Sequence, residues 1–381
     1  MTTPGLIVVG SGPAGISAAE TFRRHDKTLP VTVVTTDPHP PYERPPLSKE
    51  YLRGATDEVE LHPPQWYAER NVDVIGPAAV ANIDTAAHTL TIDGNTTAYR
   101  TLILATGADP QPPPVPGGEI ARLLRSRADA DVIRRETTSA QSAIVIGAGF
   151  IGCEAAASLA MRGLSVTIVA PEPLPQAARF GEDAGRRLLA LVQSAGVRYR
   201  GDVEVTLIEE GGVHLADGDV LRADLVLAAT GVKPNSHLAE AAGLHIEQGR
   251  ILVGPDMATS AADVYAAGDV ALAHNTTAGR HLAVEHWQDA LDQGSVAGAA
   301  AAGVRSQWDG VPGFWSTIGE STVKYHAWGD GYDSHRLVQR DNGFTVWYES
   351  DGALVGVLTY EADDDYEQGE SLIAAGKPAP V

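Results

Sequence analysis

The chain has 381 residues, of which 44% are apolar, and a formal net charge of −21 from 49 acidic and 28 basic side chains. This length allows two or three domains with their own cores, while the acidic balance disfavours binding to nucleic acid or to an anionic membrane. No stretch reaches the ~20 apolar residues of a membrane span, the N-terminus lacks a signal-peptide pattern, and the single cysteine permits no internal disulfide. We therefore expect a cytoplasmic protein.

An apolar strand, a glycine loop and a helix open the chain. Residues 6–9 are typical of a short buried strand, and residues 16–24 of a helix. The loop between them has G-x-G-x-x-G spacing and contains Gly10, Gly12, Pro13, Ala14 and Gly15. The first glycine makes the tight turn, the second lets a pyrophosphate approach the backbone, and the third lets the helix pack on the strand. The helix N-terminus then offers N–H groups to phosphates.

An acid follows the next strand at the distance expected for a ribose-binding carboxylate. Residues 31–34 form that strand, and the acid is Asp37. The alternative is a glycine-rich turn in an unrelated βαβ unit. The agreement of strand, loop, helix, strand and acid favours a dinucleotide site.

Residues 38–49 form a loop with many prolines. We expect these prolines to exclude a helix and to stiffen the backbone. The loop stands close to the cofactor site in sequence, so its polar side chains are candidates for contact. They are Arg44, Ser48 and Lys49.

Short strand-like runs follow at residues 72–75, 89–92 and 99–104. The last of them ends in the turn Ala105, Thr106 and Gly107, and a proline-rich linker covers residues 110–116.

The same plan then recurs. Residues 143–146 are a strand, and a second loop with the same glycine spacing contains Gly147, Gly149, Phe150, Ile151 and Gly152. Another strand at 166–169, a hairpin signal at 217–218 and a strand at 225–228 lead to a second Ala-Thr-Gly turn, formed by Ala229, Thr230 and Gly231. Two dinucleotide sites in one chain indicate a bound flavin dinucleotide and a visiting nicotinamide dinucleotide.

The remaining chain completes the predicted domains. Residues 264–267 are a strand followed by Gly268 and Asp269, and a helix over 283–302 opens with Glu285, His286 and Trp287. From residue 309 the sequence predicts strands at 344–348 and 354–358 and an acidic helix at 363–373. We predict an α/β fold with two Rossmann-like domains, FAD-binding (1–111 and 235–308) and NAD(P)H-binding (112–234), and a small α+β domain at 309–381.

These motifs together resemble a known family. The chain is similar to the flavoprotein reductases that serve ferredoxin-dependent oxygenases, such as the putidaredoxin, rubredoxin and biphenyl-dioxygenase ferredoxin reductases, which have the glutathione-reductase fold. The resemblance covers residues 1 to about 305. It rests on both glycine loops, both Ala-Thr-Gly turns, and the segments 42–49, 265–269 and 285–287.

The resemblance implies roles for individual residues. Asp37 would hold the adenosine ribose, the Val80 backbone the adenine, and Asp269 the ribityl or pyrophosphate part of a tightly but non-covalently bound FAD. Contacts to the same FAD are implied for Arg44, Lys49 and Arg125. Backbone N–H groups at His286 and Trp287 would face the flavin pyrimidine, where a helix N-terminus stabilises negative charge.

Lys49 and Glu154 are the catalytic candidates. The resemblance implies that they approach each other beside the flavin N5, where the hydride arrives, and that the glutamate orients the lysine. The alternatives are a solvated loop lysine and an ordinary first-turn acid favoured by the helix dipole.

Three positions depart from the family pattern. Asp109 stands where many relatives have arginine, Ala170 stands where NADH-using members usually have glutamate, and residues 314–320 keep only the Phe-Trp-Ser of a longer motif. Glu172 lies two positions after Ala170, at the place that Asp37 has after its own strand. We therefore favour NADH over NADPH, although Pro171 could turn Glu172 away and Arg179 could fold back.

The expected function is an NAD(P)H-dependent FAD reductase that passes single electrons to a ferredoxin-like iron–sulfur protein, as a monomer or homodimer. The alternatives are an NADH oxidase, a quinone or small-molecule reductase, or a redox-sensing interaction protein related to apoptosis-inducing factor. We expect Cys153 to be a packed residue. We expect no metal to be bound, because the histidines are scattered and show neither an H-E-x-x-H motif nor clustered Cys/His spacing. A docked acidic carrier would meet the densest basic stretch, Arg122, Arg125, Arg127, Arg134 and Arg135.

Overall fold

The computed structural model describes residues 3–381, which group by contacts into two compact units. Of the described residues, the first unit comprises 3–43, Glu60–Asp109 and Lys233–Phe314, and the second comprises Arg44–Val59, Pro110–Val232 and Trp315–Val381. Strands β8 (Ala108–Pro110), β16 (Val232–Pro234) and β22 (Gly313–Ile318) lie where the chain passes from one unit to the other. The proline loop from Arg44 onward groups with the second unit, and the predicted domain boundaries stay a prediction.

A five-stranded parallel sheet forms the core of the first unit. Its order is β19 (Val264–Ala266), β7 (Thr101–Leu104), β1 (Leu6–Val9), β2 (Val31–Val34) and β3 (Val72–Ile75). Val8 in the central strand pairs with Val33 on one side and Ile103 on the other, and all three are buried. Parallel strands covered on both faces need such continuous apolar runs, which is why these strands could be predicted from sequence.

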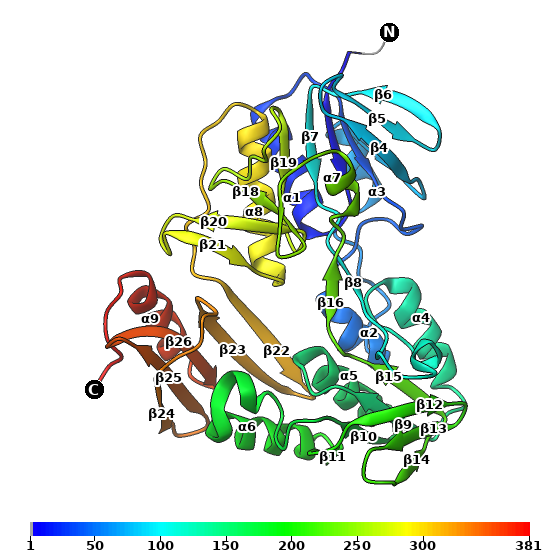
Figure 1. Ribbon diagram of the computed structural model, residues 1–381, viewed down its shortest axis with the longest axis vertical. Helices are drawn as coiled ribbons and strands as arrows, with labels where there is room; N and C mark the ends of the chain where they lie inside the picture. The colour runs from blue at the N-terminus through cyan, green and yellow to red at the C-terminus, as the bar shows by residue number, and fades with distance from the viewer. Residues whose placement is uncertain (1–2) are drawn as a thin grey trace. The chain divides into compact units, whose positions relative to one another are not determined.

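Helix α1 (Pro13–His25) is fixed by close packing on α8 (Trp287–Ala301), and the two helices lie alongside each other in Figure 1. A Cβ on Gly294 would lie 2.2 Å from Ala14 O, and one on Gly298 would lie 2.2 Å from Ala18 O. Glycines spaced by four on α8 therefore let the two backbones approach and hold the N-terminal end of α1 in place.

Smaller elements complete the first unit. They are the antiparallel sheet β4 (Val80–Asp84), β5 (Thr89–Ile92) and β6 (Asn95–Ala98), the sheet β17 (Ile246–Glu247), β18 (Arg250–Val253), β20 (Ala271–Asn275) and β21 (Arg280–Ala283), and helices α3 (Pro64–Glu69) and α7 (His237–Ala241).

The second unit repeats this plan. Its parallel sheet has the order β11 (Arg198–Arg200), β10 (Ser165–Val169), β9 (Ser142–Ile146) and β15 (Leu225–Ala228). Its antiparallel insert is β12 (Val205–Glu209), β13 (Gly212–Leu215) and β14 (Val220–Arg222), and its helices are α4 (Arg127–Glu136), α5 (Phe150–Met161) and α6 (Ala177–Ser194), with a short 3-10 turn, η2 (Gly118–Ile120). Both units therefore combine a parallel core with an antiparallel insert, in agreement with the recurring plan that the sequence predicts.

The C-terminal segment adds an α+β layer to the second unit. Its sheet has the order β22, β23 (Ser321–Ala327), β26 (Ala353–Tyr360), β25 (Phe344–Ser350) and β24 (Ser334–Gln339). Helix α9 (Asp363–Ala374) packs on β26 and β23 (Figure 1). Trp347 and Tyr348 are buried in this layer.

The proline loop contains helical turns, so the expectation that prolines exclude a helix there was wrong. Residues Pro45–Ser48 form a 3-10 turn, η1, which α2 (Glu50–Arg53) follows directly. Prolines occupy the first positions of η1, where a missing N–H costs nothing because it has no partner in the turn. No helix within residues 3–381 has the length and apolar character of a membrane span.

Candidate functional site

The two glycine loops have the same backbone geometry. Gly10 has a φ of 110° and Gly147 a φ of 104°, which L side chains rarely adopt. A Cβ on Gly10 would lie 2.1 Å from Ala105 O, and one on Gly147 would lie 2.4 Å from Ala229 O. Each loop thus packs its first glycine against the Ala-Thr-Gly turn of its own unit, at the carboxyl ends of the parallel strands.

The middle glycines are the N-cap residues of the two helices that follow the loops. Gly12 and Gly149 begin α1 and α5 with φ values of −72° and −65°, and neither helix receives a side-chain cap from the described residues. The heavy atom nearest to a Cβ on Gly149 would be Gln176 Nε2, at 3.8 Å. Uncapped helix N-termini fit the phosphates of a dinucleotide, and in the second loop there is open space beside Gly149.

Residues from distant parts of the first unit gather at its glycine loop. Gly268 packs against Ala14, where an added Cβ would lie 3.0 Å from the alanine Cβ, and its N–H donates to Gln293 Oε1 at 2.9 Å. Thr106 Oγ1 donates to Asn235 O at 2.8 Å, which fixes the turn that ends at Gly107. Pro13 and Gly15 lie in the first turn of α1.

Asp37 follows β2 and already has protein partners. Its Oδ2 accepts a hydrogen bond from Tyr42 OH at 2.6 Å, and its Oδ1 accepts from His39 N at 3.0 Å. A carboxylate has four lone-pair sites, so these bonds orient Asp37 and leave acceptor capacity for ribose hydroxyls. Val80 is the first residue of β4.

Arg250 joins two of the predicted residues in the first unit. Its guanidinium pairs with Glu285, and its Nε donates to Asp269 O at 3.3 Å. At the start of α8, His286 Nδ1 lies 3.1 Å from Asp289 Oδ2, and Trp287 begins the helix. No motif marks Arg250, so sequence reasoning missed it.

The second unit holds the catalytic candidates as a buried ion pair. Lys49 Nζ lies 2.9 Å from Glu154 Oε2, and the two residues are 6% and 2% exposed. Nζ also donates to Pro45 O at 2.9 Å. The Pro45 carbonyl therefore accepts one ammonium hydrogen, and the Glu154 carboxylate balances the ammonium charge. The interpretation of Lys49 as a solvated loop lysine does not fit this burial.

Two serines complete this cluster. Ser48 Oγ donates to Glu154 Oε2 at 2.5 Å, and Ser316 Oγ donates to Glu154 Oε1 at 2.6 Å. Ser48 is among the polar residues of the proline loop that the sequence indicates as candidates for contact. Ser316 had only its place in the Phe-Trp-Ser segment, and nothing in the sequence pairs it with Glu154.

Arg44 and Arg125 are also brought together in the second unit, because Arg44 Nη1 donates to Arg125 O at 3.1 Å. Two further arginines of the predicted basic stretch are paired with acids. Arg122 Nη2 lies 2.5 Å from Glu136, and Arg134 Nη2 lies 2.6 Å from Asp57. These ion pairs reduce the positive charge that a carrier would meet.

Glu172 lies beyond β10, and one of its carboxylate oxygens accepts a hydrogen bond from the protein. Its Oε2 accepts from Ala178 N at 3.1 Å, near the start of α6. Arg179 does not fold back onto it: its guanidinium lies 5.1 Å from the Phe180 ring and 5.3 Å from the Tyr325 ring.

The remaining predicted residues of the second loop lie at its end, in the first turn of α5. Phe150 has its ring centroid 5.7 Å from that of Phe180, while Ile151 is 49% exposed. Gly152 lies close to Gly147, because an added Cβ would be 2.2 Å from the Gly147 carbonyl oxygen. Thr230 Oγ1 donates to Gln111 O at 2.8 Å, beside Gly231.

Cys153 is buried in α5, and burial, together with the neighbouring Glu154 charge, raises the pKa of its thiol to about 12. A neutral buried thiol is a poor nucleophile. Within residues 3–381 no group of three His, Cys, Asp or Glu side chains is arranged to hold a metal ion.

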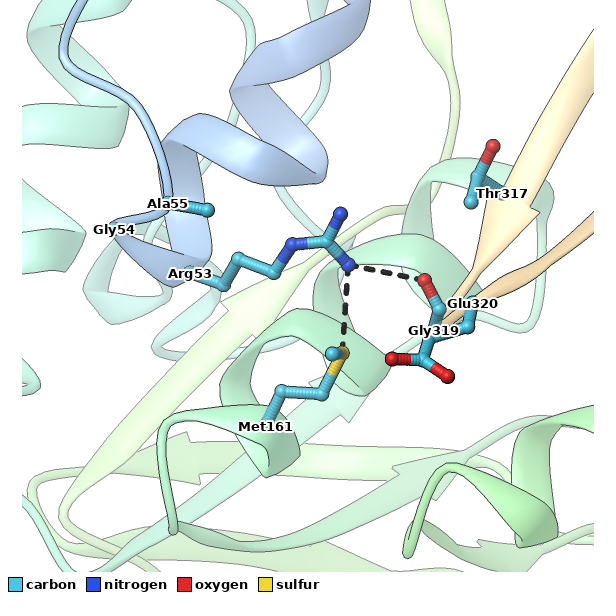
Figure 2. A pocket seen from close by; sticks show the side chains of 7 residues that line it. All are labelled: Arg53, Gly54, Ala55, Met161, Thr317, Gly319 and Glu320. Carbon is cyan, nitrogen blue, oxygen red and sulfur yellow. Dashed lines mark hydrogen bonds between the residues drawn. The ribbon is translucent and has the colours of Figure 1, made fainter.

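An open pocket of about 480 Å³ lies elsewhere in the second unit (Figure 2). Arg53 extends into it and donates to Gly319 O at 3.0 Å, as Figure 2 shows. None of the predicted site residues lines it; its lining is Arg53, Gly54, Ala55, Met161, Thr317, Gly319 and Glu320. We therefore do not assign the site to this pocket.

Comparisons with known proteins agree with this geometry. The family model described as pyridine nucleotide-disulphide oxidoreductase matches residues 4–294. Rhodocoxin reductase of Rhodococcus erythropolis is 32% identical over 98% of this chain and 90% of its own length.

Solved structures resemble the whole chain. A ferredoxin reductase from Rhodopseudomonas palustris is 29% identical with a TM-score of 0.92, covering 99% of this chain and 96% of that one. A putidaredoxin reductase in covalent complex with putidaredoxin is 29% identical with a TM-score of 0.93, covering 99% of this chain and 94% of that one.

Proposed function

We propose, from the premise that this chain belongs to the pyridine nucleotide-disulphide oxidoreductase family, that it is an NAD(P)H-dependent FAD reductase of a ferredoxin-like iron–sulfur protein. The observation that carries the proposal is a pair of matched glycine loops in a chain whose one thiol is buried. Two loops accommodate two dinucleotides, and no dithiol is present to relay electron pairs. FAD, when bound, supplies the exchange between a hydride and single electrons.

The residues of the first unit fit an FAD site. The uncapped N-terminus of α1 would bind the pyrophosphate, and Asp37, already oriented by Tyr42, would bind the adenosine ribose. Asp269 and the start of α8 would contact the remainder. Arg44, Lys49 and Arg125 are candidates for contact with FAD on the resemblance alone.

Lys49 and Glu154 would support hydride arrival. A buried ammonium favours negative charge developing on a nearby ring, because little water is present to screen it. Glu154 holds that ammonium at a fixed place through the 2.9 Å contact. The second glycine loop would bind the nicotinamide dinucleotide, with NADH favoured because Glu172 is an acid and Arg179 packs on aromatic rings instead.

The test uses the purified, FAD-loaded protein and a [2Fe–2S] ferredoxin. Acid precipitation should release FAD into the supernatant, and anaerobic NADH oxidation should reduce the ferredoxin at a rate proportional to enzyme concentration. Fast oxygen consumption without the ferredoxin would indicate an NADH oxidase instead. Slow reduction with a change in oligomeric state would indicate a redox-sensing interaction protein.

We also propose that the carrier is acidic and docks on local arginines. Arg122 and Arg134 already have acidic partners, so the patch is weaker than the sequence predicts. The kcat/KM for ferredoxin should still fall as salt rises, because exposed charges are screened beyond about 8 Å at physiological ionic strength. Reduction of ferricyanide, a small acceptor, is the control. A salt-independent kcat/KM would indicate an apolar interface.

A further inference from the structure

Glu154 is a buried carboxylate whose two oxygens are held from different parts of the chain. Oε2 accepts a hydrogen bond from Ser48 at 2.5 Å and forms an ion pair with Lys49 Nζ at 2.9 Å, and both residues belong to the proline loop. Oε1 accepts from Ser316, on strand β22, at 2.6 Å. Among residues 3–381, Ser316 is the single donor to Oε1.

Ser316 occupies an interior position of its strand. Along β22 the buried residues include Ser316 and Ile318, whereas Trp315 is exposed. Ser316 itself is 1% exposed. A buried hydroxyl without a partner costs free energy, so a serine at this position depends on the carboxylate that it contacts.

The backbone of the proline loop is fixed separately. Ser158, one helical turn after Glu154 on α5, donates through Oγ to Ser48 O at 2.7 Å. Helix α5 therefore locates the loop through Ser158, and Ser48 and Lys49 then converge on a single carboxylate oxygen. Contacts to one oxygen do not determine the orientation of the Glu154 carboxylate plane. The hydrogen bond from Ser316 to the other oxygen, Oε1, determines it.

We propose that Ser316 is a positioning residue, which orients Glu154 and through it the Lys49 ammonium. The inference rests on the proposed function, and it gives the divergent C-terminal segment a part in the reaction through one hydroxyl. Without that hydroxyl Oε1 has no donor in a site of low dielectric. The carboxylate then rotates to recover a hydrogen bond, and Lys49 Nζ follows its partner.

The first measurement is stopped-flow reduction of the FAD-loaded protein by NADH in Ser316→Ala. We expect the limiting reduction rate to fall about 10-fold, as for loss of a hydrogen bond to a charged group, with the Kd for NADH unchanged. Thr317→Val is the matched control, since Thr317 is the next residue on β22 and its hydroxyl contacts Thr322 at 2.9 Å, outside the cluster. Ser48→Ala should cost less, because Oε2 keeps Lys49.

The second measurement is a double-mutant cycle on Ser316→Ala and Glu154→Ala. Thermal unfolding of the FAD-loaded variants without nicotinamide should show a smaller combined loss of Tm than the sum of the single losses. Ser316→Ala should also leave the reduction rate of the Glu154→Ala protein unchanged. If Glu154→Ala does not fold, Ser316→Thr is the alternative, because it keeps a hydroxyl and should restore most of the rate.

Several outcomes overturn the proposal. An unchanged reduction rate in Ser316→Ala, or an equal loss in Thr317→Val, makes the Ser316 bond merely structural. Additive Tm losses mean that Ser316 and Glu154 are not coupled. A folded Ser316→Thr protein that is reduced as slowly as Ser316→Ala would show that the hydroxyl does not support the reaction. Failure of the proposed function is distinguishable, because the wild-type protein itself would then either not be reduced by a nicotinamide or be reduced without passing electrons to the ferredoxin.

Discussion

The two glycine loops share a backbone conformation, but the helices that follow them carry different chemistry. The fifth residue of α1 is Ser17, whose Oγ donates to Leu291 O at 2.6 Å and fastens α1 to α8. The fifth residue of α5 is Glu154, the centre of the buried polar cluster. The loop motif therefore specifies a place for phosphates, while a position outside the motif decides whether that unit also holds a charged group for the reaction.

The first prediction has the largest expected effect. It distinguishes a glycine that the fold requires for close packing, Gly147, from a glycine that a ligand would approach, Gly149. Gly147→Ala should lower the free energy of unfolding by more than ~3 kcal/mol, because its Cβ would meet Ala229 O at 2.4 Å and φ is positive. Gly149→Ala should keep the fold, since its φ is −65°, yet weaken NADH binding. Thermal unfolding and NADH titration measure the two effects. Equal destabilisation by both substitutions would refute the distinction.

The second prediction tests the fifth helix position. Lys49→Ala should slow flavin reduction roughly 10²-fold, as loss of a preorganised charge commonly does. It should also lower the free energy of unfolding by about 3 kcal/mol, because Glu154 would be left buried without its cation. Stopped-flow reduction and denaturant unfolding provide the two readouts.

Ser17→Ala is the control in the other helix, since Ser17 contacts a backbone carbonyl there. It should change stability by about 1 kcal/mol and leave the reduction rate unchanged. A Lys49→Ala protein that is reduced at the wild-type rate would remove Lys49 from the reaction.

The third prediction compares the acids that follow the second strand of each unit. Within residues 3–381, Asp37 accepts hydrogen bonds from Tyr42 OH and His39 N and lies 3.1 Å from His39 Nδ1, whereas Glu172 accepts one hydrogen bond, from the Ala178 N–H. Glu172→Ala should lower the ratio of kcat/KM for NADH over NADPH about fivefold, because repulsion of the 2′-phosphate by a partly exposed acid is worth ~1 kcal/mol. Glu210→Ala, at an exposed acid of the same unit, should leave the ratio unchanged. A wild-type preference for NADPH would contradict the cofactor assignment.

The fourth prediction concerns the Cys153 thiol and has the smallest expected effect. With its pKa raised to about 12, the Cys153 thiol stays neutral between pH 6 and pH 9, so its charge contributes no pH dependence there. A thiol reagent should label the chain rapidly in denaturant and negligibly in the native state at pH 8. Rapid native labelling, with loss of flavin reduction, would give Cys153 a redox role.

Local patterns made most of the fold predictable. Strands β1, β2 and β15 have the same limits in the structure as in the sequence prediction, because buried parallel strands are short runs of mostly apolar residues. The 3-10 turn at Pro45–Ser48 escaped prediction, since proline is tolerated at the first positions of a helix as well as in extended loops. The Ser316 and Arg250 contacts join residues 162 and 35 positions from their partners, and no local pattern encodes such a pairing.

The sequence by itself determined where two dinucleotide loops begin, because glycine spacing, apolar strands and a following acid are all local consequences of backbone geometry. It also determined that no dithiol is available, because the chain has one cysteine. Only the tertiary structure decided that Lys49 is buried and paired with Glu154, that two serines complete the cluster, and that arginines of the basic stretch are already neutralised. The physical reason is that burial and ion pairing depend on which distant segments come into contact, and a side chain carries the same charge in the sequence whether or not its partner is near.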